Sequence, residues 1–269
     1  MSKKNIGSEQ TQNACPFVRF GNGDEIIVIF PPINDSIFTM KDIAQYAQHL
    51  FKSLSRDYTI YVIGRRRDLP VGYGTRDMAR DYAETFALLS LGAVNLIGVS
   101  LGGMIAQHFT YDYPRHIKRL ILIGTAHHMG PEGLEIARRW IPWARRSLWK
   151  EITEETINIT FHGMYRLFLQ ILKPFLIRYY LRQLKNTADF IISGEAGILH
   201  DSSQILASLA QPVLILGGTA DRFFPESLFH EMDQKIPNCH LLLVKGARHG
   251  VLEQHKKACL EMIGKFLKK

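Results

Sequence analysis

The sequence predicts an α/β fold: a mostly parallel central sheet with helices on both faces and a helical cap inserted late in the chain. Short, continuously apolar segments alternate with segments whose apolar residues recur at helical spacing. Uninterrupted apolar strands are typical of a sheet that is covered on both faces. The alternation stops near residue 126 and resumes near residue 212. We therefore expect a core formed by residues 1–125 and 206–269, with residues 126–205 forming the cap.

The individual elements follow from the same patterns. We expect a disordered tail over 1–14 and a turn at 21–24 that joins two strands as a hairpin. Strands are expected at 16–20, 25–30, 58–63, 93–97, 117–123, 212–218 and 241–244. Helices are expected at 40–54, 76–91, 101–113, 226–235 and 253–268. The arginine run at 65–67 favours a solvated loop rather than an anion site.

The stretch with the clearest chemical meaning is Gly98-Val99-Ser100-Leu101-Gly102, which follows a strand and precedes a helix. This context is typical of a nucleophile elbow, a sharp turn that exposes one serine hydroxyl. The flanking glycines allow the close backbone approach that such a turn requires. Ser100 is therefore the candidate nucleophile, placed where helix N–H groups favour developing negative charge.

A serine hydroxyl near neutral pH needs a base, and the base needs an acid to orient it. Asp221 follows the strand at 212–218, and His249 follows the strand at 241–244. The chain order Ser100, Asp221, His249 is that of the α/β-hydrolase arrangement. The three residues form the candidate catalytic triad.

On these motifs, the sequence resembles the α/β-hydrolase superfamily, and specifically its cap-bearing members, from residue 17 to the C-terminus. The resemblance implies that Ser100 is the nucleophile, His249 the general base and acid, and Asp221 the residue that orients His249. It also implies an oxyanion hole made of two backbone N–H groups. The family commonly has His-Gly in the loop after the strand at 25–30, whereas this chain has Pro31-Pro32, which lack N–H groups. We expect the donors to be Ile33 and Leu101.

The cap segment indicates the kind of substrate. It contains all three Trp of the chain and many Phe, Leu and Ile residues. Although most of these should pack the cap onto the core, they also predict an apolar acyl or ring pocket beneath it. The candidate substrate contacts are Asn34, His127, Trp140, Trp143 and Phe168.

Charge is concentrated in the same segment. The chain has a formal net charge of +8, and residues 138–185 hold ten Lys or Arg against three Glu, an excess of seven. Basic amphipathic helices bind anionic interfaces. The cap could therefore contact anionic lipid weakly, with Arg178, Arg182 and Lys185 on one helical face, although a solvated outer face explains the same charges. We expect no nucleic-acid partner, because no nucleic-acid motif appears.

The remaining composition points to a cytoplasmic protein without cofactors. The three Cys suggest no disulfide framework, and they and the His residues show no metal-ligand spacing. The polar first residues resemble no signal peptide, and no apolar run is long enough to span a membrane. A Ser-His-Asp triad needs neither metal nor organic cofactor.

The function predicted from these observations is hydrolysis of a carboxylic ester with an apolar acyl or ring group, through an acyl-enzyme. The same triad also supports acyl transfer or hydrolysis of a carbon–carbon bond. A hydrolase-like ligand-binding protein or receptor with little turnover is the alternative from a different class, and the altered loop at Pro31-Pro32 is the feature that favours it.

Overall fold

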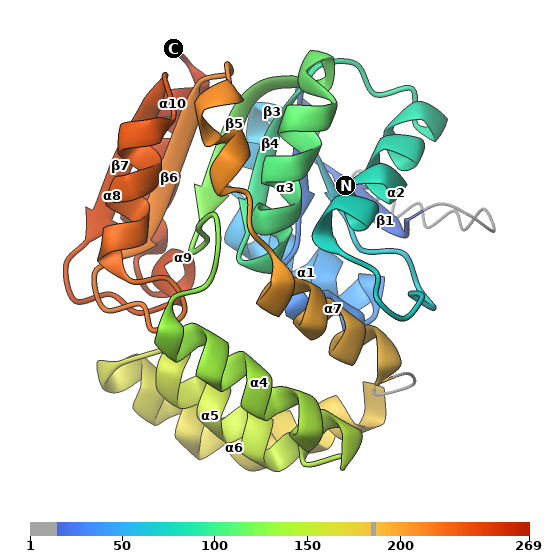
Figure 1. The fold of residues 1–269 in the computed structure, drawn as a ribbon, viewed down its shortest axis with the longest axis vertical. Coiled ribbons are helices and arrows are strands. Elements are labelled where there is room, and N and C mark those ends of the chain that lie inside the picture. Colours follow the sequence, from blue (N-terminus) through green and yellow to red (C-terminus); the bar gives the residue numbers. More distant parts are fainter. Residues whose placement is uncertain (1–14, 184–186) are drawn as a thin grey trace.

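The computed structural model describes residues 15–183 and 187–269, and the tail expected at 1–14 lies outside them. Its centre is a seven-stranded sheet in the order β1-β3-β2-β4-β5-β6-β7 (Figure 1). The strands are β1 (Phe17–Phe20), β2 (Glu25–Phe30), β3 (Tyr58–Ile63), β4 (Val94–Val99), β5 (Ile117–Ile123), β6 (Val213–Gly218) and β7 (Cys239–Val244). All neighbouring strands pair in parallel except β1 and β3. The predicted fold class is confirmed.

Helices cover both faces of the sheet, as the apolar strands require. The core helices are α1 (Met40–Leu50), α2 (Thr75–Leu88), α3 (Leu101–Asp112), α8 (Glu226–Lys235), α9 (Val251–Gln254) and α10 (Lys256–Leu267). Alternate residues of β2 enter two separate apolar clusters. Val28 and Phe30 belong to the cluster that includes residues of α2, α3 and α8, whereas Ile27 and Ile29 belong to the cluster that includes residues of α1, α9 and α10. This period of two follows from the alternating direction of side chains along a strand.

The prediction that the first two strands form a hairpin is wrong. Strand β1 pairs antiparallel with β3, with Phe17 opposite Ile63, and it does not pair with β2. The segment 21–24 instead passes close to the start of β3, where a Cβ atom on Gly21 would lie 2.2 Å from the carbonyl oxygen of Tyr58. Gly21 also has a φ of +86°, which glycine adopts without strain.

Between β5 and β6 the described residues form four α-helices, here called the cap helices: α4 (Pro131–Arg145), α5 (Trp149–Thr160), α6 (Gly163–Gln183) and α7 (Ala188–Leu199). Helices α4, α5 and α6 lie together at the end of the molecule beyond the carboxyl ends of the parallel strands, and α7 runs between them and the core (Figure 1). Trp149 of α5 contacts Phe190 of α7 edge to face, with ring centroids 5.2 Å apart. The cap helices therefore share an apolar interior of their own that is continuous with the core.

Two further features bear on earlier expectations. Cys15, Cys239 and Cys259 are all free thiols. Among the described residues, no helix combines the length and the apolar character needed to cross a membrane.

Candidate active site

Ser100 occupies the turn between β4 and α3 in a conformation that non-glycine residues rarely adopt, with φ 50° and ψ −119°. The surrounding glycines explain how the turn fits. A Cβ atom on Gly102 would lie 2.1 Å from the carbonyl oxygen of Phe30, and one on Gly103 would lie 2.2 Å from the Thr125 methyl group. The sequence therefore folds into a strained elbow that only small residues permit, and strain of this kind is concentrated at functional sites.

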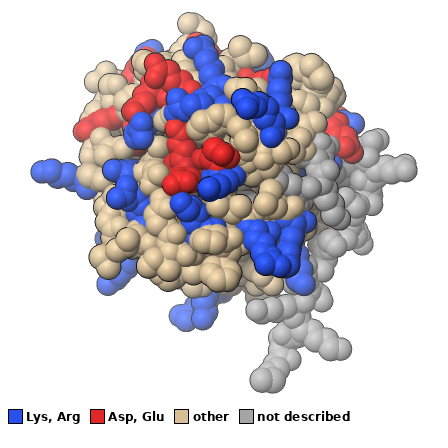
Figure 2. All heavy atoms as spheres, turned by 90° about the horizontal axis from the view of Figure 1, so that it is seen from below, with Lys and Arg blue, Asp and Glu red and all other residues tan. Residues whose placement is uncertain are grey.

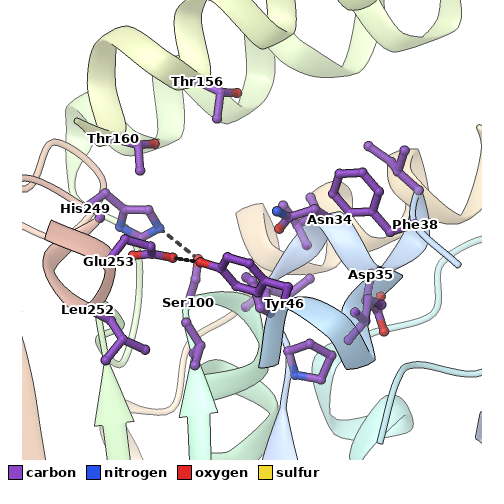
Figure 3. Close-up of a pocket in the computed structure, with 18 of the residues that line it drawn as sticks. Asn34, Asp35, Phe38, Tyr46, Ser100, Thr156, Thr160, His249, Leu252 and Glu253 are labelled. Carbon is purple, nitrogen blue, oxygen red and sulfur yellow. Dashed lines mark hydrogen bonds between the residues drawn. The ribbon is translucent and has the colours of Figure 1, made fainter. Parts of the chain in front are cut away.

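His249 lies between Ser100 and Asp221 in a continuous relay. Its Nε2 atom is 3.0 Å from the Ser100 hydroxyl, and its Nδ1 atom is 2.8 Å from Oδ2 of Asp221. Figure 3 shows the imidazole turned toward the serine at the carboxyl end of β4. The structure thus brings together three residues that are up to 149 positions apart in the chain.

The carboxylate of Asp221 is held in place by the backbone that follows it. The side chain has no solvent exposure, and its Oδ1 atom accepts hydrogen bonds from the N–H groups of Phe223 (2.8 Å) and Phe224 (3.2 Å). With Oδ2 facing His249, both oxygens have partners. This arrangement fixes the imidazole tautomer in which Nε2 is free to accept the serine proton.

The environment of His249 also sets its basicity. Burial of the ring by itself lowers the pKa of His249, whereas the charge of Asp221, the hydrogen bond with it and the more distant charge of Glu253 raise it. The net effect is a pKa above the usual value for histidine. Such a group is a better proton acceptor than a free imidazole.

Of the two expected oxyanion donors, Leu101 directly follows Ser100 in the chain, and Ile33 lies on the loop after β2. Leu101 begins α3, and Ile33 begins a short 3₁₀ turn (Ile33–Ser36) that follows Pro31-Pro32. Both residues line the same cavity as Ser100. Within residues 15–183 and 187–269, neither N–H donates to a protein acceptor. Both are therefore available to a substrate oxygen.

The prediction of a solvated loop at 65–67 is wrong for Arg65. Its side chain is only 1% exposed and forms an ion pair with Asp35, whose side chain is equally buried. Its guanidinium also donates to the carbonyl oxygens of Pro31 (3.3 Å), Pro32 (3.2 Å) and Ile33 (2.9 Å). Since β2 and β3 are neighbours, the loops after these strands meet. Arg65 therefore braces the loop that carries the Ile33 N–H, a contribution that the sequence analysis missed.

Ser100 opens into a cavity of about 600 Å³ that lies between the sheet edge, α1 and the cap helices. Its wall is mostly aliphatic and aromatic, with Thr156 and Thr160 of α5 pointing toward the serine from the far side (Figure 3). Two of the predicted contacts, Asn34 and Trp140, line it. The Trp140 indole N–H donates to Glu155 at 2.7 Å, which orients the ring.

Three other predicted contacts do not line this cavity. His127 is buried behind the site, with its Nε2 atom 3.5 Å from a Glu231 carboxylate oxygen, and burial lowers its pKa. Trp143 packs partly buried against the core, with the Arg139 guanidinium over its ring at 5.7 Å. Phe168 is 56% exposed on the outside of α6. The sequence shows that these residues are apolar or aromatic but not which face of each element meets the cavity.

The charge of the cavity wall is opposite to that of the whole chain. Among the described lining residues there is no Lys or Arg, whereas Asp42 and Glu253 are both present. The Tyr46 hydroxyl donates to Glu253 at 2.5 Å, and Figure 3 labels both among the residues that line the cavity with Ser100. A third acidic lining residue, Asp35, is paired with Arg65.

Comparison with known proteins gives a consistent result. The family model described as "alpha/beta hydrolase fold" matches residues 63–256. A 2-hydroxy-6-oxononadienedioate/2-hydroxy-6-oxononatrienedioate hydrolase from a Pseudomonas species is 25% identical over 92% of this chain and 89% of its own length. A pimeloyl-[acyl-carrier protein] methyl ester esterase from Vibrio parahaemolyticus is 21% identical over 90% of this chain and 94% of its own.

Among solved structures, the fold is similar to that of MGS-M2, an α/β-hydrolase enzyme from a Medee basin deep-sea metagenome library. The TM-score is 0.80 at 18% identity, and the match covers 94% of both chains.

Proposed function

Because the chain belongs to the α/β-hydrolase family, with hydrolases and esterases among its relatives, we propose that it is a serine hydrolase that cleaves carboxylic esters with a neutral, apolar acyl group. The observation that carries the proposal is the relay from Ser100 through His249 to Asp221 at the wall of an apolar cavity. Ser100, His249 and Asp221 are the proposed catalytic triad.

In the proposed reaction, the Ser100 oxygen attacks the ester carbon while His249 Nε2 takes the hydroxyl proton. The N–H groups of Leu101 and Ile33 donate to the carbonyl oxygen as it becomes negative. His249 then gives the proton to the departing alkoxide, so an alcohol leaves and an acyl-enzyme remains. Water, deprotonated by the same imidazole, attacks the acyl carbon; His249 then returns the proton to the Ser100 oxygen as the carboxylic acid leaves.

The preference for neutral substrates rests on the charges of the cavity wall. The relative from Pseudomonas is named for a dienedioate, a dicarboxylate. In this chain the described wall offers no cation to such a substrate and presents the carboxylates of Asp42 and Glu253 instead. A carboxylate buried without a partner costs several kcal/mol. This disfavours carbon–carbon bond hydrolysis of a dicarboxylate and favours ester cleavage.

The test compares two esters of equal chain length: p-nitrophenyl octanoate and the p-nitrophenyl monoester of suberic acid, which ends in a carboxylate. We expect kcat/KM for the octanoate to be higher by about 100-fold or more, equivalent to at least 2.7 kcal/mol. Ser100→Ala should abolish both activities. Glu253→Gln should reduce the ratio of the two kcat/KM values. Trp143→Phe, which alters an aromatic residue outside the cavity, should leave this ratio unchanged.

Equal kcat/KM values for the two esters would contradict the proposed substrate preference but would leave the proposed triad unaffected. Absence of turnover with both esters would support the receptor alternative, and product formed only with an added alcohol would indicate an acyltransferase.

A further inference from the structure

Helix α6 (Gly163–Gln183) is the cap helix that carries the most exposed apolar side chains. None of its residues with a described side chain is buried. It lies at the far end of the cap, away from the sheet (Figure 1). It is also the longest helix described, with 21 residues. A mostly apolar helix in which no described side chain is buried is unusual for a protein that works in water alone.

The two sides of α6 have different surroundings. Leu169 and Leu176 line the cavity described above. Beside this side of the helix lies the outer stripe, four large apolar residues spaced four, three and four positions apart, which places them on one helix face. The members of the outer stripe and their exposed fractions are Met164 (78%), Phe168 (56%), Ile171 (67%) and Phe175 (73%).

The charged residues of α6 are all basic, and they indicate what kind of partner the outer stripe would contact. The helix contains Arg166, Lys173, Arg178 and Arg182 but no Asp or Glu. The three arginines are exposed, whereas Lys173 pairs with Glu154 at 3.0 Å. Figure 2 views this end of the molecule and shows Lys and Arg side chains around a central group of Asp and Glu, to which α6 contributes no acidic residue. The partner that complements the exposed surface of α6 is therefore apolar and negatively charged.

We propose that α6 docks the protein onto an anionic lipid surface, with the outer stripe at the boundary of the acyl chains and the arginines among the headgroups. Helices that lie in this interface combine exposed apolar and basic side chains. On α6, Arg178 and Arg182 lie seven residues after Ile171 and Phe175 and so continue the side of the outer stripe toward the end of the helix. A second copy of the chain fits less well. A symmetric contact would bring α6 of both copies together, and neither helix has an acidic residue to neutralise the arginines of the other.

Docking through α6 would place the cavity next to the lipid, because α6 would contact the lipid with the outer stripe and line the cavity with Leu169 and Leu176. A helix is about 10 Å across, so an apolar ester dissolved in the bilayer would lie close to the cavity wall. This relation to substrate rests on the proposed function, whereas the docking itself does not.

The test is sedimentation of the full chain with sucrose-loaded vesicles of phosphatidylcholine, with and without phosphatidylglycerol. Ser100→Ala protein is measured in parallel, so that binding is assessed independently of catalysis. We expect both proteins to sediment with the anionic vesicles and to be released by salt. Arg178→Gln/Arg182→Gln should weaken binding by about 10- to 30-fold, since each cation near an anionic surface contributes about fivefold.

Phe168→Ser/Phe175→Ser should weaken binding by about tenfold or more for each side chain. The matched control is Val71→Ser/Leu88→Ser, which removes two apolar residues that are 92% and 59% exposed elsewhere on the surface. The control should bind like wild type, and circular dichroism checks that each variant is folded.

Three outcomes would overturn the proposal: no sedimentation of wild type with anionic vesicles, equal loss in the control, or equal binding to vesicles without phosphatidylglycerol. A wild-type dimer that Phe168→Ser/Phe175→Ser converts to a monomer, with no vesicle binding, would assign the stripe to a second copy instead. Vesicle binding by Ser100→Ala together with failure of every ester assay would leave the docking intact and reject only the proposed function.

Discussion

Replacing Arg65 with methionine tests whether a buried ion pair holds the loop that carries Ile33, the proposed oxyanion donor. The change removes the charge from a side chain that is 1% exposed and leaves the Asp35 carboxylate buried without its partner. Breaking a buried pair in this way costs about 3–5 kcal/mol of folding stability. It also removes the donors to the carbonyl oxygens of Pro31, Pro32 and Ile33. Losing one oxyanion donor typically lowers kcat by about 100- to 1,000-fold.

We therefore expect Arg65→Met to lower both the free energy of unfolding and kcat, with a smaller change in KM because the cavity wall remains. A second variant, Arg65→Met/Asp35→Asn, separates the two effects. It removes both charges, and the Asn oxygen can still accept the N–H of residue 65, which Asp35 accepts at 2.6 Å. Stability should largely return, because removing both members of a buried pair is close to neutral. The value of kcat should stay low, because the three carbonyls still lack their donor.

The assays are urea unfolding and steady-state hydrolysis of p-nitrophenyl octanoate. The control is Arg66→Met, since the Arg66 side chain is 40% exposed and lies 3.8 Å from Asp81, which also accepts a hydrogen bond from Tyr73 (2.8 Å). The loss of stability in this control should be smaller than in Arg65→Met, because solvent screens the exposed guanidinium and Asp81 keeps its other partner. Recovery of kcat together with stability in the double variant would refute the positioning role of Arg65. So would a loss of stability in Arg65→Met with kcat unchanged.

The remaining predictions concern pH and backbone packing. Because the Glu253 charge raises the pKa of His249, Glu253→Gln should move the acid limb of the kcat/KM profile to lower pH; an unmoved or raised limb would contradict this. Burial holds the pKa of His200 well below its usual value of about 6.5, so the unfolded chain binds a proton there that the folded chain does not. Stability should therefore fall as the pH drops below about 6.5, and less steeply in His200→Gln; parallel unfolding curves would be inconsistent with this. Gly102→Ala should lower kcat by about 100-fold or more, because its Cβ would lie 2.1 Å from the Phe30 carbonyl oxygen; near-normal kinetics would show that the elbow can shift without loss.

The parts of the molecule that local patterns specify were predictable from sequence. A strand, a glycine-flanked serine and a helix define the turn at Ser100, and the strand ends before Asp221 and His249 place both residues at the same edge of a parallel sheet. This edge is where the carboxyl ends of parallel strands meet. The relay geometry follows from the topology, which the alternation of elements predicts.

What the sequence could not supply depends on contacts between distant segments. Arg65 looks like part of a solvated run until β2 and β3 become neighbours and Asp35, thirty positions away, faces it. Strand β1 could pair with either of two apolar strands, β2 or β3, and the glycine-rich turn at 21–24 does not determine which one it pairs with. Phe168 and Trp143 have the composition of pocket residues, but the side of the helix that meets the cavity is fixed only by packing.

The most direct test of the central claim is the intact mass of the protein after treatment with a stoichiometric amount of a fluorophosphonate. The account predicts one adduct per chain, mapped by peptide sequencing to Ser100, and strongly reduced labelling in His249→Ala because the base that activates the hydroxyl is gone. A wild-type protein that stays unlabelled, or an adduct on any other residue, would contradict it.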